Sequence, residues 1–170
     1  MLSSHFESAG HRFNSLAYAF NCTIVALALL TLGACTTTNP SVGKFNNKAY
    51  ENATSIKARA LALVDLSAEP YTKHEQTAVT LMTDVSAARE FSAGLPNNSI
   101  SAAQWDAIRD PQRNLLGGYI GKWKARTGAG MAEFFRKEVK TQLSRAFDYL
   151  ICLEANKGAA KPCSNLAPAT

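Results

Sequence analysis

A cysteine at the end of an apolar run is the residue of this sequence whose setting most clearly suggests chemistry. Residues 24–32 are nine consecutive Ile, Val, Ala, Leu and Thr side chains, and Gly33, Ala34 and Cys35 follow directly. Small side chains suit a peptidase that holds an extended backbone, and a thiol supplies a soft nucleophile. The apolar run has the length of a secretory core and is short for a bilayer crossing.

The stretch Leu32-Gly33-Ala34-Cys35 resembles the lipobox of bacterial lipoproteins. In that family the cysteine is linked to diacylglycerol before the leader is cleaved. The resemblance implies that residues 1–34 are a signal peptide and that Cys35 is lipidated. Because Thr36 rather than Asp follows the cysteine, the resemblance favours the outer membrane, with the protein facing the periplasm.

Residues 35–46 are expected to form a tether between the lipid and the folded body. The segment has no hydrophobic period and contains Pro40 and Gly43. Its eleven residues after the cysteine reach at most about 36 Å when fully extended, which keeps the body close to the membrane. The alternative to a cleaved signal peptide is an uncleaved membrane anchor, because residues 16–34 form a mostly apolar stretch of bilayer-spanning length. Whether it is cleaved or retained, this leader is not part of the predicted fold.

Two of the four cysteines remain for a disulfide. Cys22 lies within the leader and Cys35 takes the lipid, which leaves Cys152 and Cys163. The envelope compartment permits disulfides, and the even count predicts the bond, with two reduced thiols as the alternative. At 100° per residue, Cys152 points away from the apolar stripe of its helix and toward a returning tail.

A group of glycines, aromatic residues and cations lies in residues 114–127, NLLGGYIGKWKART. It is not a phosphate-binding loop, because the glycine-to-lysine spacing is too short and Trp123 stands where a Ser or Thr would bind magnesium. Close packing of a neighbouring backbone against Gly117 and Gly121 is one interpretation. A Trp among cations also suits a membrane interface. The candidate contact surface comprises Trp105, Tyr119, Lys122, Trp123, Lys124 and Arg126.

The sequence shows no constellation typical of a metal site or an active site. After Cys35 the chain has a single histidine, His74, and no closely spaced cysteine pair. The serines lack a nucleophile-elbow motif. Asp106 and Asp110 have i,i+4 spacing, but Asp110 is better explained as a helix cap. We therefore expect no metal, no cofactor and no enzymatic activity.

Apolar residues recur at helical spacing from residue 47 onward. The stripes are Ala53, Ile56, Ala60 and Leu63; Ala78, Leu81, Val85 and Ala88; and Phe135, Val139, Leu143, Ala146, Leu150 and Leu153. Lys157 near the end and Gly158 just past it predict where the last helix stops. No segment alternates long enough to predict a strand. We predict an all-α helical bundle over residues 47–157, followed by a tail, 158–170.

The internal helix boundaries are less uniform. Pro70 predicts either a kink in one long helix or a hairpin of two, and the sequence leaves both open. Ser101 and Gln104 have capping-box spacing, which predicts a short helix from Ala102 that stops before Asp110-Pro111. Asp110 and Pro111 are expected to start the next helix, with Asp110 as its cap.

Charge is spread unevenly along the chain. Residues 36–106 carry 6 basic and 7 acidic side chains, whereas residues 107–170 carry 11 and 5. Such an imbalance is typical of a solubilising surface and also favours anionic neighbours, such as lipid headgroups or an acidic partner. Nucleic acid is not expected for an exported protein.

Together these features predict a non-enzymatic, membrane-tethered protein of the bacterial envelope that acts by contact with an envelope protein or surface. The stretches EPYTKHEQ and QWDAIRDPQRNLLGG resemble small uncharacterised helical lipoproteins of bacteria, a resemblance that carries no activity. The alternative is a periplasm-facing binding module for a small apolar or anionic ligand. It predicts an enclosed cavity lined by residues such as Met82, Phe135 and Phe147.

Overall fold

The computed structural model describes residues 43–159, Cys163 and Leu166. The predicted signal peptide, Cys35 and most of the tether and tail lie outside the described residues. Within them the chain forms only helices and no strand. The elements are α2 (Asn47–Leu66), η2 (Tyr71–Lys73), α3 (Glu75–Gly94), α4 (Ser99–Arg109), α5 (Leu116–Ala125) and α6 (Glu133–Ala155). The predicted all-α bundle with a long C-terminal helix is confirmed.

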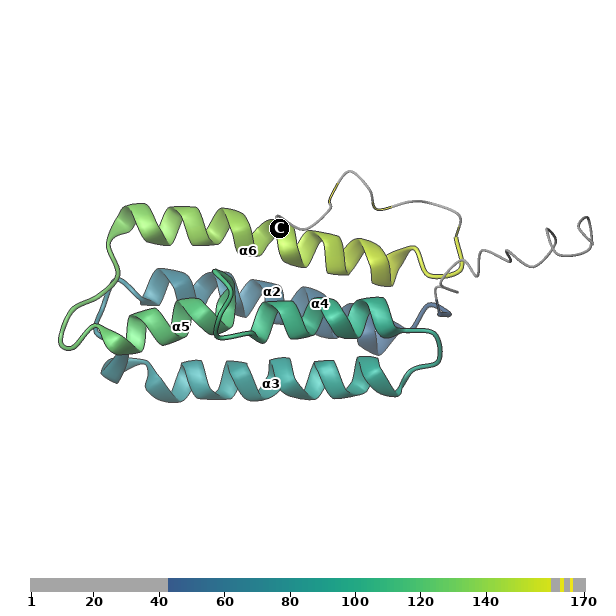
Figure 1. Ribbon diagram of the computed structural model, residues 1–170, viewed down its shortest axis with the longest axis horizontal. Helices are drawn as coiled ribbons and strands as arrows, with labels where there is room; N and C mark the ends of the chain where they lie inside the picture. Colours follow the sequence, from purple (N-terminus) through teal and green to yellow (C-terminus); the bar gives the residue numbers. More distant parts are fainter. Residues whose placement is uncertain (1–42, 160–162, 164–165, 167–170) are drawn as a thin grey trace, which may run out of the picture. The chain divides into compact units, whose positions relative to one another are not determined.

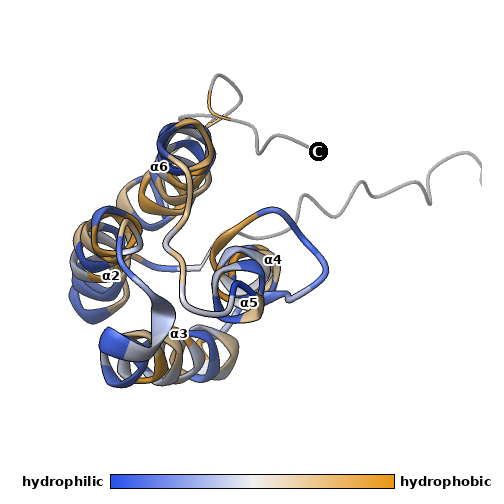
Figure 2. Ribbon diagram, turned by 90° about the vertical axis from the view of Figure 1, so that its left-hand side faces the viewer, coloured by the Kyte–Doolittle hydropathy of each residue, from blue (hydrophilic) through white to orange (hydrophobic). Residues whose placement is uncertain are grey.

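The helices occupy four corners, and α4 and α5 follow one another along the same corner (Figures 1 and 2). Helix α2 packs against α3 and α6, and α4 packs against the same two helices. Ion pairs from Lys57 to Asp148, at 2.5 Å, and from Lys140 to Asp65, at 2.8 Å, show that α2 and α6 run in opposite directions. The result is an up-down-up-down bundle whose third helix is broken in two.

The core is built from the predicted apolar stripes. Every predicted stripe residue of α2 and α3 is buried, and so are four of the six on α6, namely Val139, Leu143, Ala146 and Leu150. Trp105 and Phe147 meet edge to face with ring centroids 6.0 Å apart. Burying a large apolar side chain contributes about 1.5–3 kcal/mol, so these residues supply most of the driving force for folding. Of the other two stripe residues on α6, Leu153 is partly buried, whereas Phe135 is 54% exposed.

Pro70 separates two helices and does not kink a single one. Helix α2 ends at Leu66, Pro70 precedes the single turn η2, and α3 begins at Glu75. Because proline lacks an N–H and clashes with the preceding turn, it cannot continue α2. The hairpin is therefore the correct one of the two alternatives.

The predicted start of α4 is wrong by one turn. The helix begins at Ser99, and Ser101 is buried inside it, so Ser101 and Gln104 do not form the predicted capping box. The preceding residue, Asn98, is buried and donates from Nδ2 to the carbonyl of Ser92, at 2.9 Å. This bond joins the loop to the end of α3, and α4 begins directly after Asn98.

Helix α4 ends at Arg109 as predicted, but Asp110 and Pro111 do not start α5. The carboxylate of Asp110 accepts a hydrogen bond from the backbone N–H of Gln112, at 2.8 Å, which closes a turn. A Cβ on Gly117 would lie 2.0 Å from the Arg109 carbonyl oxygen, whereas one on Gly121 would meet nothing within 4 Å. Close packing thus occurs at Gly117 but not at Gly121, and the neighbour is the end of α4.

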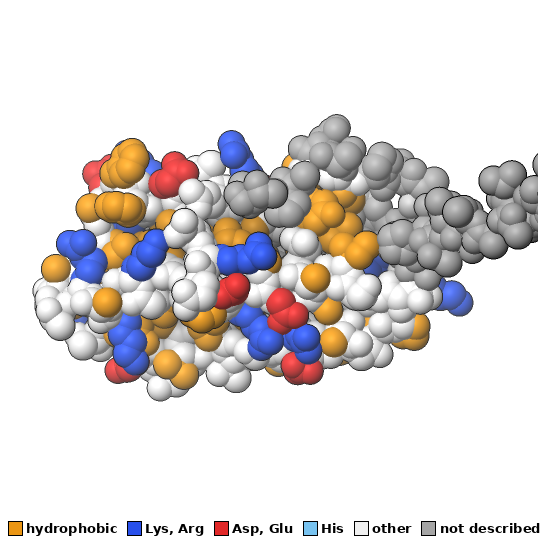
Figure 3. Space-filling model, in the orientation of Figure 1, with side chains coloured by type: hydrophobic (Ala, Val, Ile, Leu, Met, Phe, Trp, Pro, Cys, Tyr) orange, Lys and Arg blue, Asp and Glu red, His pale blue; other side chains and the backbone are white. Residues whose placement is uncertain are grey.

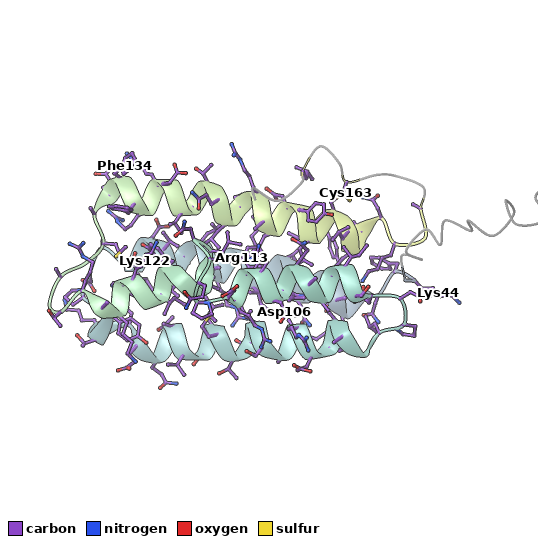
Figure 4. All side chains as sticks on the ribbon, in the orientation of Figure 1. Lys44, Asp106, Arg113, Lys122, Phe134 and Cys163 are labelled. Carbon is purple, nitrogen blue, oxygen red and sulfur yellow. A yellow bond between two sulfur atoms is a disulfide. The ribbon has the colours of Figure 1, made fainter. Side chains whose placement is uncertain are left out.

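At the end of α6, the predicted Cys152–Cys163 disulfide is formed. Gly158 has a φ of 80°, a left-handed conformation that glycine adopts at little cost. The chain enters the bundle nearby, where the N–H of Gly43 donates to the carbonyl of Asn97, at 3.0 Å. Figure 4 shows Lys44 and Cys163 in the same half of the bundle. We call this half the entry end.

Candidate contact surface at the α5–α6 end

The aromatic members of the predicted contact surface are not on the surface. Trp105 is 1% exposed, Tyr119 2% and Trp123 0%. A large aromatic side chain buries about 150–250 Å² of surface, so the bundle gains more stability when such a side chain lies in its core than when it lies on the surface. The prediction is therefore wrong for these three residues.

Tyr119 and Trp123 join α5 to the turn that follows α2. The hydroxyls of Tyr119 and Ser67 lie 2.5 Å apart, and burial raises the pKa of Tyr119. The indole Nε1 of Trp123 donates to the carbonyl of Glu69, at 2.9 Å. The ring of Tyr71 contacts the indole edge to face, with centroids 5.2 Å apart. These buried rings pack at one end of the hydrophobic core, so they are not accessible to a binding partner.

The cations of the predicted surface are exposed. Lys122 donates to the side-chain oxygen of Asn114, at 2.6 Å, and Lys124 lies 3.7 Å from a carboxylate oxygen of Glu75. Arg126 has no carboxylate within ion-pair distance among the described residues. Two of the three cations therefore retain a charge that no described carboxylate neutralises.

Two neighbouring phenylalanines stand on the surface at the start of α6. Phe134 is 74% exposed and Phe135 54%, and their rings meet edge to face at 5.9 Å. The apolar stripe predicts a core position for Phe135 and makes no prediction for Phe134. A signal for Phe134 is its direction, because adjacent helical residues point about 100° apart and Phe134 therefore lies off the predicted stripe.

These phenylalanines and cations lie at one end of the bundle. Residues 126–132 connect the end of α5 to the start of α6, and Figure 4 shows Lys122 and Phe134 in the same half. In Figure 3 hydrophobic side chains border basic ones there. Residues 116–137 hold five basic side chains and one acidic. We define the contact end as Lys122, Lys124, Arg126, Phe134, Phe135 and Lys137.

Two described carboxylates lie within ion-pair distance of the contact end, and each faces one of its lysines. Glu75 lies 3.7 Å from Lys124. Glu133 pairs with Lys137 at 2.6 Å, and that hydrogen bond holds the pKa of Glu133 below its usual value. The arrangement offers apolar rings and positive charge together. This combination suits non-covalent binding to an apolar or anionic surface.

An open depression of about 600 Å³ is lined by α3, α4 and the loop after α4, and both Asp106 and Arg109 line it. Arg89 and Arg109 both bind the carboxylate of Asp106, at 3.1 and 2.8 Å. The hydrogen bond from Arg89 is the main reason that the pKa of Asp106 is lowered. Arg89 also pairs with Glu90, at 3.1 Å, so the two arginines face two carboxylates and the depression is not a prepared anion site.

The enclosed cavity expected for a binding module is not formed by the predicted residues. Phe147 is fully buried against Trp105, and Phe135 is half exposed at the end of the bundle. Met82 lines open surface depressions beside α3. The three side chains therefore do not enclose a common space.

Within residues 43–159, Cys163 and Leu166, no three potential metal ligands gather into a site. None of the helices described there combines the length and apolarity that a membrane crossing requires. The chain matches no known family model, and neither curated proteins nor solved structures yielded a similar protein. The class that the structure defines is an all-α helical bundle with a cationic and aromatic end.

Proposed function

We propose that this protein is a lipid-anchored, non-enzymatic contact protein of the bacterial envelope, held at the outer membrane and facing the periplasm. The proposal combines the lipobox at residues 32–35 with the contact end of the bundle. Lipid on Cys35 supplies the first attachment. The contact end supplies a second one, to an envelope protein or surface.

The observation that carries the proposal is that the chain enters the bundle at the end opposite the contact end. Lys44 and Phe134 lie at opposite ends of the bundle in Figure 4. Helix α6 has 23 residues and runs between these ends, which corresponds to about 34 Å. Exposed phenylalanine rings are costly to leave in water, and apolar patches bordered by polar residues mark interaction sites. A body that is tethered at one end and has its contact end at the other is suited to docking onto a second envelope component or to bridging two of them.

Lipid attachment is tested with the full chain expressed in a bacterium that is fed an alkyne analogue of palmitate. The wild type should be labelled, and its mature N-terminus should be Cys35. Cys35→Ser should lose the label and keep its leader, whereas the matched variant Cys22→Ser should be labelled normally. An intact leader on the wild type, or label retained by Cys35→Ser, would refute the anchor.

The contact end is tested in the same cells by crosslinking. The double variant Phe134→Ser, Phe135→Ser should lose the crosslinks that the wild type forms with other envelope components. Val79→Ser, at a 49% exposed position on α3, should preserve them. Unchanged crosslinking in the phenylalanine variant would exclude this end as the contact surface. No observation on the described residues favours the alternative ligand-binding module.

A further inference from the structure

We infer that the contact end docks onto the anionic headgroups of a lipid bilayer, with Phe134 and Phe135 entering the boundary between headgroups and acyl chains. This inference names the surface that the proposed function leaves open, and rests on that function for its biological setting. The docking itself follows from the exposure and charge of described residues.

The apolar part of the argument is the position of the two rings. Phe134 and Phe135 lie in the first turn of α6, beside the exposed loop residues 126–129. Their rings touch each other and together form one apolar projection. Interfacial anchors of peripheral proteins use such rings and bury them about 5–10 Å into the headgroup and acyl boundary.

The electrostatic part is the set of cations at the same end of the bundle as the rings. Lys122 and Arg126 have no described carboxylate partner, whereas Glu133 is paired with Lys137 and Glu75 lies 3.7 Å from Lys124. Arg136 follows the rings directly and adds a further positive charge, with its Nε buried and without a hydrogen-bond partner among the described atoms. Net positive charge at the same end as an apolar projection matches the charge of an anionic bilayer.

The shape of the contact end favours a bilayer over a folded protein partner. A specific protein interface requires a complementary surface of about 800 Å² on each partner. Phe134 and Phe135 project from the end of the bundle, while the described depressions are lined by α2, α3, α4, their loops, Tyr71 and Ile120. A fluid bilayer accepts a convex projection without a matching pocket.

The dimensions allow both attachments to the same membrane. The bundle measures about 34 Å along α6, and the seven residues between Cys35 and Gly43, which is hydrogen-bonded to Asn97, span at most about 23 Å. A lipid on Cys35 and the phenylalanines at the contact end would therefore lay the bundle along the membrane.

The test uses a tryptophan reporter in the full chain. Phe134→Trp is reconstituted into vesicles that contain brominated lipids, which quench tryptophan only at bilayer depth. The native Trp105 and Trp123 are buried in the core and give a low background. Val79→Trp on α3 is the matched control, and circular dichroism verifies that each variant retains the helical fold.

In vesicles rich in phosphatidylglycerol, Phe134→Trp should be quenched at least threefold more strongly than Val79→Trp. The difference should fall in phosphatidylcholine vesicles, in 0.5 M salt, and when Lys122, Arg126 and Lys137 are all replaced by Gln. Phe135→Trp provides a second reporter if the first variant does not fold. Equal quenching of the Phe134 and Val79 reporters in anionic vesicles would overturn the inference.

The outcome is separable from that of the lipid anchor. Quenching without palmitate label would retain the docking surface and remove the anchor, whereas label without quenching would do the reverse. A photocrosslinker at position 134 that joins a protein but no lipid would assign the contact end to a protein partner and would contradict bilayer docking.

Discussion

The indole nitrogen of Trp123 donates a hydrogen bond to the main-chain carbonyl of Glu69, at 2.9 Å. This bond joins the last turn of α5 to the turn after α2. Although Trp123 lies between two lysines in the sequence, its role is therefore structural. The lysines on either side of it face solvent, so one short segment supplies both this structural contact and part of the contact end.

Replacing Trp123 with Phe tests this assignment. The substitution removes the donor to Glu69 and leaves space in the core, so the free energy of unfolding should fall by about 2–3 kcal/mol. Chemical denaturation followed by circular dichroism measures it. If Trp123 were a surface contact residue, stability would not change and vesicle binding would be lost.

Two glycines of α5 should respond to alanine in opposite directions. A Cβ on Gly118 would lie 1.9 Å from the carbonyl oxygen of Arg113, which belongs to the loop before the helix. Gly118→Ala should therefore destabilise the bundle by about 1–3 kcal/mol. Gly121→Ala meets open space and should stabilise it by about 0.5–1 kcal/mol through helix propensity. Equal midpoints of thermal unfolding for the two variants would contradict the loop packing.

Glu154 and Lys157 form an ion pair in which each side chain is only 1% exposed. Glu154→Gln leaves the ammonium of Lys157 buried without its counter-charge, so we expect a loss of about 3 kcal/mol in unfolding free energy. The double variant Glu154→Leu with Lys157→Met removes both charges and should recover much of that loss. The single variants Glu154→Leu and Lys157→Met complete the double-mutant cycle, and additive losses in it would show that the two charges are not coupled.

The carboxylate of Asp106 makes stability depend on pH. The hydrogen bond from Arg89, followed by that from Arg109, holds its pKa below the ordinary value of 3.8 in the folded protein. The unfolded chain therefore binds a proton first as the pH falls. The stabilisation from this carboxylate is complete well above the ordinary pKa and is lost as the pH drops through the ordinary and then the folded pKa.

Asp106→Asn provides the measurement for this pH dependence. The difference in unfolding free energy between wild type and variant should be largest near pH 6 and should shrink as the pH is lowered below 4. Urea titrations at successive pH values give the difference directly. A difference that stays constant from pH 6 to pH 3 would show that Asp106 is not the titrating group.

The helices could be predicted because their signals are local. The stripe of Val139, Leu143 and Leu150 repeats at 3.6-residue spacing, and only a helix buries all three on one side. The disulfide likewise follows from cysteine count and from the direction of Cys152 on its helix. These features require no knowledge of which elements become neighbours.

The contact end could not be predicted in the same way, because exposure depends on tertiary neighbours. Trp123 and Tyr119 lie among lysines and glycines, yet η2 and the turn after α2 cover them. Phe135 continues the α6 stripe by one turn but lies beyond the part that the other helices cover. The start of α4 was missed for a related reason, since Asn98 anchors the loop to a carbonyl on α3.

Photocrosslinking in intact cells tests the central claim most directly. A photoreactive phenylalanine analogue is placed at position 134 in the full chain and, as the control, at position 79 on α3. We predict lipid adducts, identified by mass spectrometry, at position 134 and none above background at position 79. Equal adduct yields at the two positions, or no lipid adduct at position 134, would contradict a membrane-docking end.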